Sequence, residues 1–144
     1  MGLAILSPRS SRGSAFGDFD NDGDVDVLVM NMNEAPLLLR NEYFSKSTRG
    51  PNNWLTLNLT GTKSNRSAIG ARVTLKAGAQ LQFQEVTSQS SYYSHNDHRL
   101  HFGLGQNKQA DVIEIIWPSG DREVLNNVSA NKIVSIKEGS GIVK

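Results

Sequence analysis

The sequence predicts an all-β fold whose largest part is an antiparallel β-sandwich or barrel-like domain. Three observations lead to this prediction. Apolar and polar residues alternate with a period of two along most of the chain, and no window shows the 3.6-residue period of an amphipathic helix. Turn-forming residues recur at a spacing of roughly ten residues. Many short strands separated by turns are typical of sandwiches and barrels.

Each expected strand follows from its own alternation or apolar run. Alternation predicts strands over 24–30, 54–59, 71–76, 80–84, 99–104 and 133–136. Residues 112–117 are apolar on nearly both faces, which predicts a central strand. The Pro-Ser-Gly segment 118–120 then predicts a turn, with Pro118 at its second position because proline presets the backbone there.

The composition divides the chain into two parts. The polar segment 45–53 contains glycine and proline, and it predicts a boundary between residues 1–48 and a β domain of residues 49–144. The first part carries seven Asp/Glu against four Lys/Arg, a net charge of −3, and the second has a net charge of +4. Two or three strands are too few for a stable sheet, so we expect the first part to pack on the second or on further sequence.

The composition also excludes several functional classes. The 144 residues contain no cysteine, which excludes a disulfide scaffold, thiolate zinc sites and iron–sulfur clusters. The net charge of +1, without a basic cluster, gives no indication of nucleic-acid binding. No stretch of about 18 apolar residues predicts a membrane span. The first residues are too short for a signal peptide, so we expect the chain to be a piece of a longer protein.

Residues 18–26, Asp-Phe-Asp-Asn-Asp-Gly-Asp-Val-Asp, carry the strongest chemical signal and are called the aspartate loop below. Side-chain oxygens at its positions 1, 3, 5 and 9 would converge in a tight turn, which Gly23 at position 6 permits. Calcium binds about six to eight oxygens, and the carbonyl at position 7 is the natural backbone ligand. The predicted cofactor is therefore Ca²⁺, and the predicted metal ligands are Asp18, Asp20, Asp22, Asp24 and Asp26.

Charge repulsion and sequence spacing define this expected site further. Two carboxylates about 4 Å apart repel by about 4 kcal/mol at an effective dielectric constant of 20, so the loop needs a cation to close. An EF-hand loop has a bidentate glutamate at position 12 and a helix after it, whereas position 12 here is Val29 within an expected strand. We therefore expect Asp26 to close the site. Magnesium suits such a loop less well, because it keeps its waters.

The first part of the chain resembles the calcium loop of an FG-GAP or VCBS-type repeat. The resemblance rests on residues 12–31, RGSAFGDFDNDGDVDVLVMN, and on residues 36–41, PLLLRN, which are similar to the next strand of such a repeat. These repeats form β-propeller blades in integrins and many secreted bacterial proteins. The resemblance implies that residues 1–48 are an N-terminal partial propeller-type repeat, about half of a four-stranded blade.

Three motifs in the second part resemble the ASPIC/UnbV domain, which occurs in cartilage acidic proteins and in many secreted bacterial proteins. They are residues 67–73 (SAIGARV), 99–105 (RLHFGLG) and 116–120 (IWPSG). Their order and spacing match the family, in which a propeller repeat commonly precedes the domain. The resemblance implies an extracellular or cell-surface β domain with no agreed enzymatic activity.

No arrangement of residues indicates catalysis, and we predict that the protein is not an enzyme. His95, His98 and His101 lie three residues apart, a spacing that does not converge on a strand. The neighbouring serines lack a G-x-S-x-G elbow. Acidic residues outside the aspartate loop are scattered, with no pair suited to glycoside hydrolysis.

The resulting functional prediction is a non-catalytic, extracellular calcium-binding module for adhesion or scaffolding, in the C-terminal part of a larger propeller-containing protein. The alternative is a carbohydrate-binding module that uses Tyr92, Tyr93 and Trp54, because aromatic rings favour ligand contacts at exposed sites. The expected partner is an extracellular protein or a glycan. The oligomeric state stays open, since an exposed strand edge in the first part also permits dimerisation.

Overall fold

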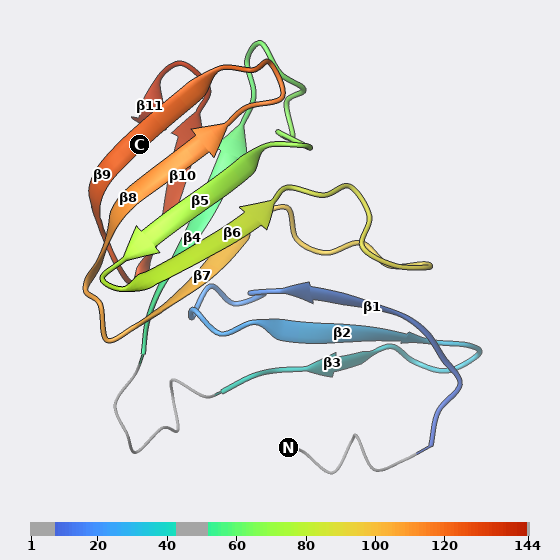
Figure 1. Cartoon of the computed structure of the whole chain (residues 1–144). Coiled ribbons are helices and arrows are strands. Elements are labelled where there is room, and N and C mark those ends of the chain that lie inside the picture. Colours follow the sequence, from blue (N-terminus) through green and yellow to red (C-terminus); the bar gives the residue numbers. More distant parts are fainter. Residues whose placement is uncertain (1–7, 43–51, 144) are drawn as a thin grey trace.

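The computed structural model describes residues 8–42 and 52–143 and consists of three β-sheets (Figure 1). The N-terminal sheet is antiparallel, in the order β1-β2-β3. Its strands are β1 (Ser11–Gly17), β2 (Asp26–Asn31) and β3 (Leu37–Leu39). Within the two described ranges there is no helix, and hence none that could cross a membrane.

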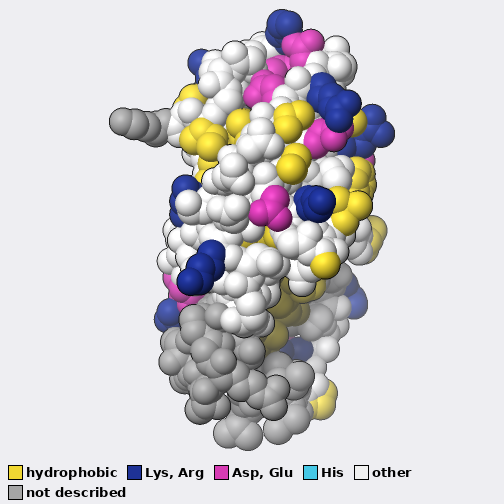
Figure 2. All heavy atoms as spheres, turned by 60° about the vertical axis from the view of Figure 1, so that its left-hand side comes forward, with side chains coloured by type: hydrophobic (Ala, Val, Ile, Leu, Met, Phe, Trp, Pro, Cys, Tyr) yellow, Lys and Arg dark blue, Asp and Glu magenta, His cyan; other side chains and the backbone are white. Residues whose placement is uncertain are grey.

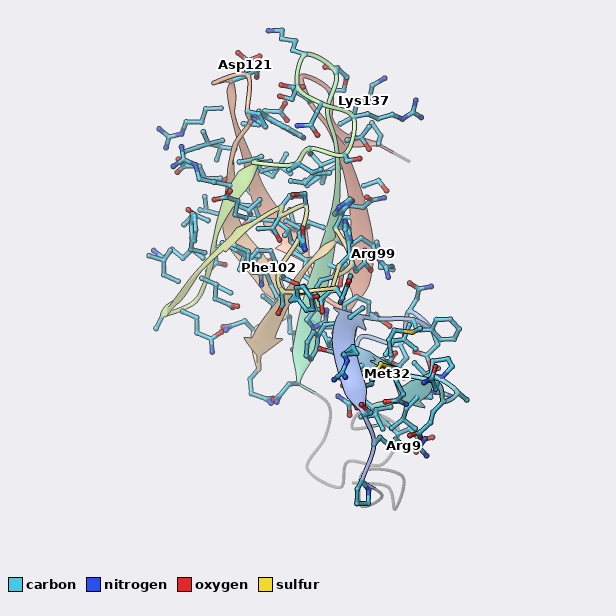
Figure 3. All side chains as sticks on the ribbon, turned by 90° about the vertical axis from the view of Figure 1, so that its right-hand side faces the viewer. Arg9, Met32, Arg99, Phe102, Asp121 and Lys137 are labelled. Atoms are coloured by element: carbon cyan, nitrogen blue, oxygen red, sulfur yellow. The ribbon has the colours of Figure 1, made fainter. Side chains whose placement is uncertain are left out.

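Two four-stranded sheets form the β domain, which confirms the all-β prediction. The first has the order β11-β10-β4-β7 and contains β4 (Asn53–Thr60), β7 (Leu100–Gly105), β10 (Lys132–Lys137) and β11 (Gly141–Val143). The second has the order β6-β5-β8-β9 and contains β5 (Arg72–Ala77), β6 (Gln80–Glu85), β8 (Gln109–Ile116) and β9 (Arg122–Ser129). Figure 3 shows the two sheets side by side, with the N-terminal sheet at one end of the pair.

Alternate residues of the two sheets fill the space between them and form one core. Buried side chains from the first sheet include Leu55, Leu57, Phe102, Leu104 and Ile136, and those from the second include Val73, Leu75, Ile113 and Ile115. Each such side chain stabilises the fold by about 1.5–3 kcal/mol through removal of apolar surface from water. The apolar strand β8 lies between β5 and β9, as its pattern predicts.

One strand pair departs from the antiparallel expectation. β10 lies parallel to β4, with Lys132 opposite Leu55 and Lys137 opposite Thr60. The reason is that β9 and β10 are consecutive in the chain but belong to different sheets, so their connection crosses the sandwich and forms no hairpin. Only a hairpin within one sheet forces neighbouring strands to be antiparallel.

Glutamine side chains join the two sheets at the edge formed by β6 and β7. Gln82 Nε2 donates a hydrogen bond to the carbonyl of Gly103 (2.7 Å), and Gln84 Nε2 donates one to the carbonyl of His101 (2.5 Å). Side chains rather than a backbone ladder therefore connect these two edge strands. The domain is a sandwich and not a closed barrel, and the glutamines protect an edge that could otherwise pair with another chain.

A buried carboxylate organises the other end of the sandwich, where Figure 3 labels Asp121 and Lys137. Glu138 is 2% exposed. Its carboxylate accepts hydrogen bonds from the amides of Thr62, Lys63 and Ser64 (2.7 to 2.8 Å) and from the hydroxyls of Ser64 (2.8 Å) and Ser119 (2.6 Å). Burial by itself would raise the pKa of Glu138, but the hydrogen bonds from Ser119, Ser64 and Thr62 outweigh it and lower the pKa to about 2.

Candidate cation-binding loop

The aspartate loop joins β1 to β2 and folds around its first carboxylate. Asp18 is 3% exposed. Its Oδ1 accepts a hydrogen bond from the amide of Asp22 (3.1 Å), and its Oδ2 accepts one from the amide of Gly23 (3.0 Å). Asp22 Oδ1 in turn accepts a hydrogen bond from the amide of Asp24 (2.9 Å). These bonds turn the chain back on itself and bring alternate side chains together.

Three of the five predicted ligands converge. Asp18, Asp20 and Asp22 each offer a carboxylate oxygen, and these oxygens lie within 4.8 Å of one another. Both carboxylate oxygens of Asp20 are buried without a hydrogen bond. The nearest compensating charge is the guanidinium of Arg40, whose Nη2 forms an ion pair with Asp20 Oδ2 at 2.5 Å and lies 3.9 Å from Asp22 Oδ2. Within residues 8–42 and 52–143, no other cluster of His, Asp and Glu has ligand atoms this close together.

Asp24 and Asp26 lie outside this trio. Both are buried. The two oxygens of Asp26 accept hydrogen bonds from the amides of Phe19 (3.0 Å) and Asn41 (2.7 Å). The carboxylate predicted to close the cation site thus closes the loop backbone and attaches it to the segment after β3.

Trp54 on β4 lies directly against the aspartate loop. Gly23 has a φ of +96°, and a Cβ at this position would overlap Nε1 and Cε2 of the Trp54 indole. The indole also stacks on His101, with ring centroids 6.0 Å apart and an interplanar angle of 17°. Burial lowers the pKa of His101 below its ordinary value. Trp54, predicted to bind a ligand, therefore contacts the loop and His101 at the junction of the two parts of the chain.

Arg99 makes the second contact between the loop and the β domain. Its Nη2 donates a hydrogen bond to the carbonyl of Asp18 (2.7 Å), and its Nη1 donates one to Oδ1 of Asn21 (2.6 Å). Asp97 holds the guanidinium by accepting a hydrogen bond from Nε (2.6 Å). Figure 3 shows Arg99 where the N-terminal sheet meets the sandwich. Arg99 was not among the predicted site residues, and its only signal in the sequence is its place in the motif 99–105.

Residues 61–143 match the model of the family described as ASPIC and UnbV. The chain belongs to the ASPIC/UnbV family. The matched range begins just after β4 and includes Arg99 and Glu138, whereas the aspartate loop and Trp54 lie outside it.

Relatives of this ASPIC/UnbV chain extend over the N-terminal part as well. Cartilage acidic protein 1 of Homo sapiens is 31% identical over 140 residues, which cover 95% of the chain and 20% of the relative. The protein of the same name from Mus musculus is 32% identical over 140 residues, which cover 95% and 21%. That from Xenopus tropicalis is 33% identical over 111 residues, which cover 75% and 16%. The chain thus spans about a fifth of the length of these relatives.

The ASPIC/UnbV domain also holds β1 through the segment before β7. Phe16 accepts a hydrogen bond on its carbonyl from the amide of Asp97 (2.9 Å) and donates from its amide to Oδ1 of Asn96 (3.1 Å). The amide of Ser14 donates to Oγ of Ser94 (3.0 Å). The edge strand of the N-terminal sheet is therefore paired with a loop of the domain.

Tyr92 and Tyr93 lie at the tip of this loop. They are 70% and 71% exposed, with ring centroids 4.1 Å apart and an interplanar angle of 53°. A bridge between Ser91 and Ser94 closes the turn that carries them. The structure thus places the tyrosine pair in solvent and Trp54 in a half-buried contact with the aspartate loop, so the three predicted aromatics differ in accessibility.

The three histidines do not gather around one point. The rings of His95 and His98 lie 4.7 Å apart, whereas His101 stacks on Trp54 and places Nδ1 3.1 Å from Oγ1 of Thr56. In the part of the chain that the structure describes, no cluster suited to a metal includes a histidine. A junction cavity of about 220 Å³ is lined by His98 and His101 together with Asp18.

Proposed function

We propose that this ASPIC/UnbV chain is a non-catalytic, extracellular calcium-binding module for adhesion or scaffolding. The observation that carries the proposal is the trio of Asp18, Asp20 and Asp22, in which the buried oxygens of Asp20 receive no hydrogen bond and Asp20 Oδ2 has an ion pair with Arg40. The single positive charge of Arg40 does not balance three clustered carboxylates, and buried carboxylates are costly unless cations compensate them. The donor set consists only of hard oxygens, which calcium prefers. The carbonyl of Asp24 and solvent would supply further oxygens.

The apolar surface of the N-terminal sheet supports the proposal that residues 1–48 are a partial FG-GAP/VCBS-type repeat of a longer protein. Leu28 and Met30 of β2, Leu38 of β3 and Phe16 of β1 are 39% to 49% exposed. By their register, Leu28 and Leu38 lie on one face, and Phe16, opposite Val27, lies on the other. A sheet that is apolar on both faces is typical of strands covered on both sides, as neighbouring blades of a propeller would cover it.

An extracellular location and a protein partner fit the surface and the relatives. The relatives named above are cartilage acidic proteins, which supports an extracellular setting for this chain. On the face shown in Figure 2, basic side chains alternate with acidic and hydrophobic ones and do not form a basic patch. A mixed surface of this kind favours a protein partner over a nucleic acid.

A calcium titration of the protein tests this proposal. We expect saturable 1:1 binding with a Kd of about 10⁻⁴–10⁻³ M, as in extracellular modules, and a higher melting temperature in calcium than in chelator. A free calcium concentration of 100 times the Kd would raise the free energy of unfolding by about 2.7 kcal/mol. Asp20→Asn should remove the calcium response. Glu34→Gln, which changes an exposed acid between β2 and β3 that pairs with Arg9, should leave it intact. A wild-type protein without any response to calcium contradicts the proposal.

A second candidate function, carbohydrate binding, is favoured by the exposed tyrosine pair on a turn that hydrogen bonds fix to β1. A glycan array with the wild type and Tyr92→Ala tests it. Specific glycan signals that Tyr92→Ala abolishes would support this function. An array without any signal would contradict it and leave adhesion or scaffolding as the remaining candidate.

A further inference from the structure

Arg99 belongs to the β domain but holds the aspartate loop through the carbonyl of Asp18 and the side chain of Asn21. We propose that Arg99 is a positioning residue for the cation site, and that cation binding in turn strengthens the docking of the N-terminal sheet on the sandwich. This inference rests on the proposed calcium site. The inference adds a specific set of contacts through which the ASPIC/UnbV domain and the N-terminal repeat stabilise each other.

The hydrogen bonds of Arg99 fix the loop on both sides of Asp20. Nη2 binds the carbonyl of Asp18, and Nη1 binds the side chain of Asn21, so the loop is held two residues before Asp20 and one residue after it. The guanidinium is itself oriented by Asp97 and its side chain is only 23% exposed. A planar guanidinium with several fixed partners holds its geometry more firmly than a flexible ammonium does.

Asn21 shows why the loop needs such support. Its φ of +59° lies in the left-handed region, which asparagine adopts more readily than most residues but still at some cost. This conformation reverses the chain between Asp20 and Asp22, whose carboxylates must both face the cation. The hydrogen bond from Arg99 stabilises that reversal, so the loop is preorganised for a ligand.

Trp54 supports the loop at its other end. Gly23 follows Asp22 directly and packs on the indole so closely that a Cβ has no space. The three carboxylates are therefore flanked by two contacts with the β domain, one from β4 and one from Arg99. Calcium binding to the loop and docking of the N-terminal sheet on the sandwich both depend on these contacts. The two equilibria are therefore linked, and each must strengthen the other by the same factor.

The experiment measures calcium binding and thermal unfolding of the full chain with calcium chloride as the probe. Arg99→Lys keeps the charge but removes the planar fork, and Asn21→Gly removes the acceptor while permitting the left-handed backbone. We expect each variant to bind calcium about tenfold more weakly than the wild type and to show a smaller rise in melting temperature at a fixed calcium concentration. The matched control is Arg122→Lys, which alters an exposed ion pair with Glu114 and should bind calcium as the wild type does.

The double variant Arg99→Lys/Asn21→Gly separates positioning from a general loss of stability. If the two residues act through their mutual hydrogen bond, the calcium affinity of the double variant is no lower than that of the single variant with the lower affinity. If Arg99 serves only the fold, its replacement lowers the melting temperature equally with and without calcium and leaves the calcium affinity unchanged, which overturns the inference. If Arg99→Lys fails to fold, the calcium affinity of Asn21→Gly tests the positioning role in its place. A wild-type protein that binds no calcium refutes the proposed function itself, and this inference with it.

Discussion

Two carboxylate centres lie at opposite ends of the β-sandwich and differ in how their negative charge is compensated. In the aspartate loop, three carboxylates crowd together, and the oxygens of Asp20 receive no hydrogen bond. At the other end, the single carboxylate of Glu138 receives five hydrogen bonds from amides and hydroxyls. The first centre has an excess of negative charge and the second has an excess of donors.

The difference separates a binding site from a structural anchor. A carboxylate surrounded by donors is complete, because its charge is compensated within the fold. A group of carboxylates with too few donors is incomplete, and a cation from solvent is the simplest way to complete it. The count of acidic residues alone would not distinguish the two centres, whereas the ratio of donors to carboxylates does.

The largest effect is expected at the anchor. Glu138→Gln turns one acceptor oxygen into a donor that faces other donors, so we expect the free energy of unfolding to fall by about 2–4 kcal/mol. Chemical denaturation near pH 7 measures this change. Glu114→Gln is the control, because Glu114 forms a partly exposed ion pair with Arg122 and should cost less than about 1 kcal/mol. Equal losses in both variants would show that Glu138 is no anchor.

The pH dependence of stability provides an independent test of the same carboxylate. Its pKa is about 2 in the folded protein against an ordinary value of 4.5. A lowered folded-state pKa contributes stability that is fully present above pH 4.5 and is lost as the pH falls from 4.5 to about 2. The wild type should therefore lose on the order of 2 kcal/mol more than Glu138→Gln over this interval. Parallel curves for the two proteins would contradict the lowered pKa.

The sequence predicted the aspartate loop better than the anchor, for a physical reason. Acids spaced two apart around a glycine are a local pattern, and the structure brings Asp18, Asp20 and Asp22 together as that pattern predicts. The turn in which Gly120 donates to the carbonyl of Trp117 is also local and was expected. Glu138 gains its role from amides more than seventy residues away, which no local pattern contains.

The fold shows the same division between local and long-range information. Alternating strands in the core were predicted, but β9 was not, because only Val128 of its eight residues is buried. The parallel pairing of β10 with β4 and the contact of Arg99 with the loop depend on the way the sheets pack. Periodicity identifies which residues face the core, but it contains no information on which strands become neighbours.

A change at the contact of the loop with Trp54 should have an intermediate effect. Gly23→Ala places a Cβ in the indole at a φ of +96°, so we expect a loss of about 1–3 kcal/mol in stability together with weaker calcium binding. Thermal melts with and without calcium measure both effects. Gly103→Ala is the matched control, since a Cβ there has no atom within 4 Å. A stable Gly23→Ala protein with unchanged calcium affinity would show that the loop forms independently of Trp54.

The smallest effect concerns Arg40, the only cation that forms an ion pair with the trio among the described residues. Its side chain is 56% exposed, so solvent screens the pair and its contribution to stability is small. Because Arg40 repels a second cation, Arg40→Gln should raise the calcium affinity about two- to threefold at low salt, and the gain should shrink as ionic strength rises. Arg9→Gln, which removes an arginine that precedes β1 and pairs with Glu34, controls for net charge. A lower calcium affinity in Arg40→Gln would mean that Arg40 holds the trio in place, as the amides around Glu138 hold that carboxylate. The two centres would then differ only in how many donors each carboxylate receives.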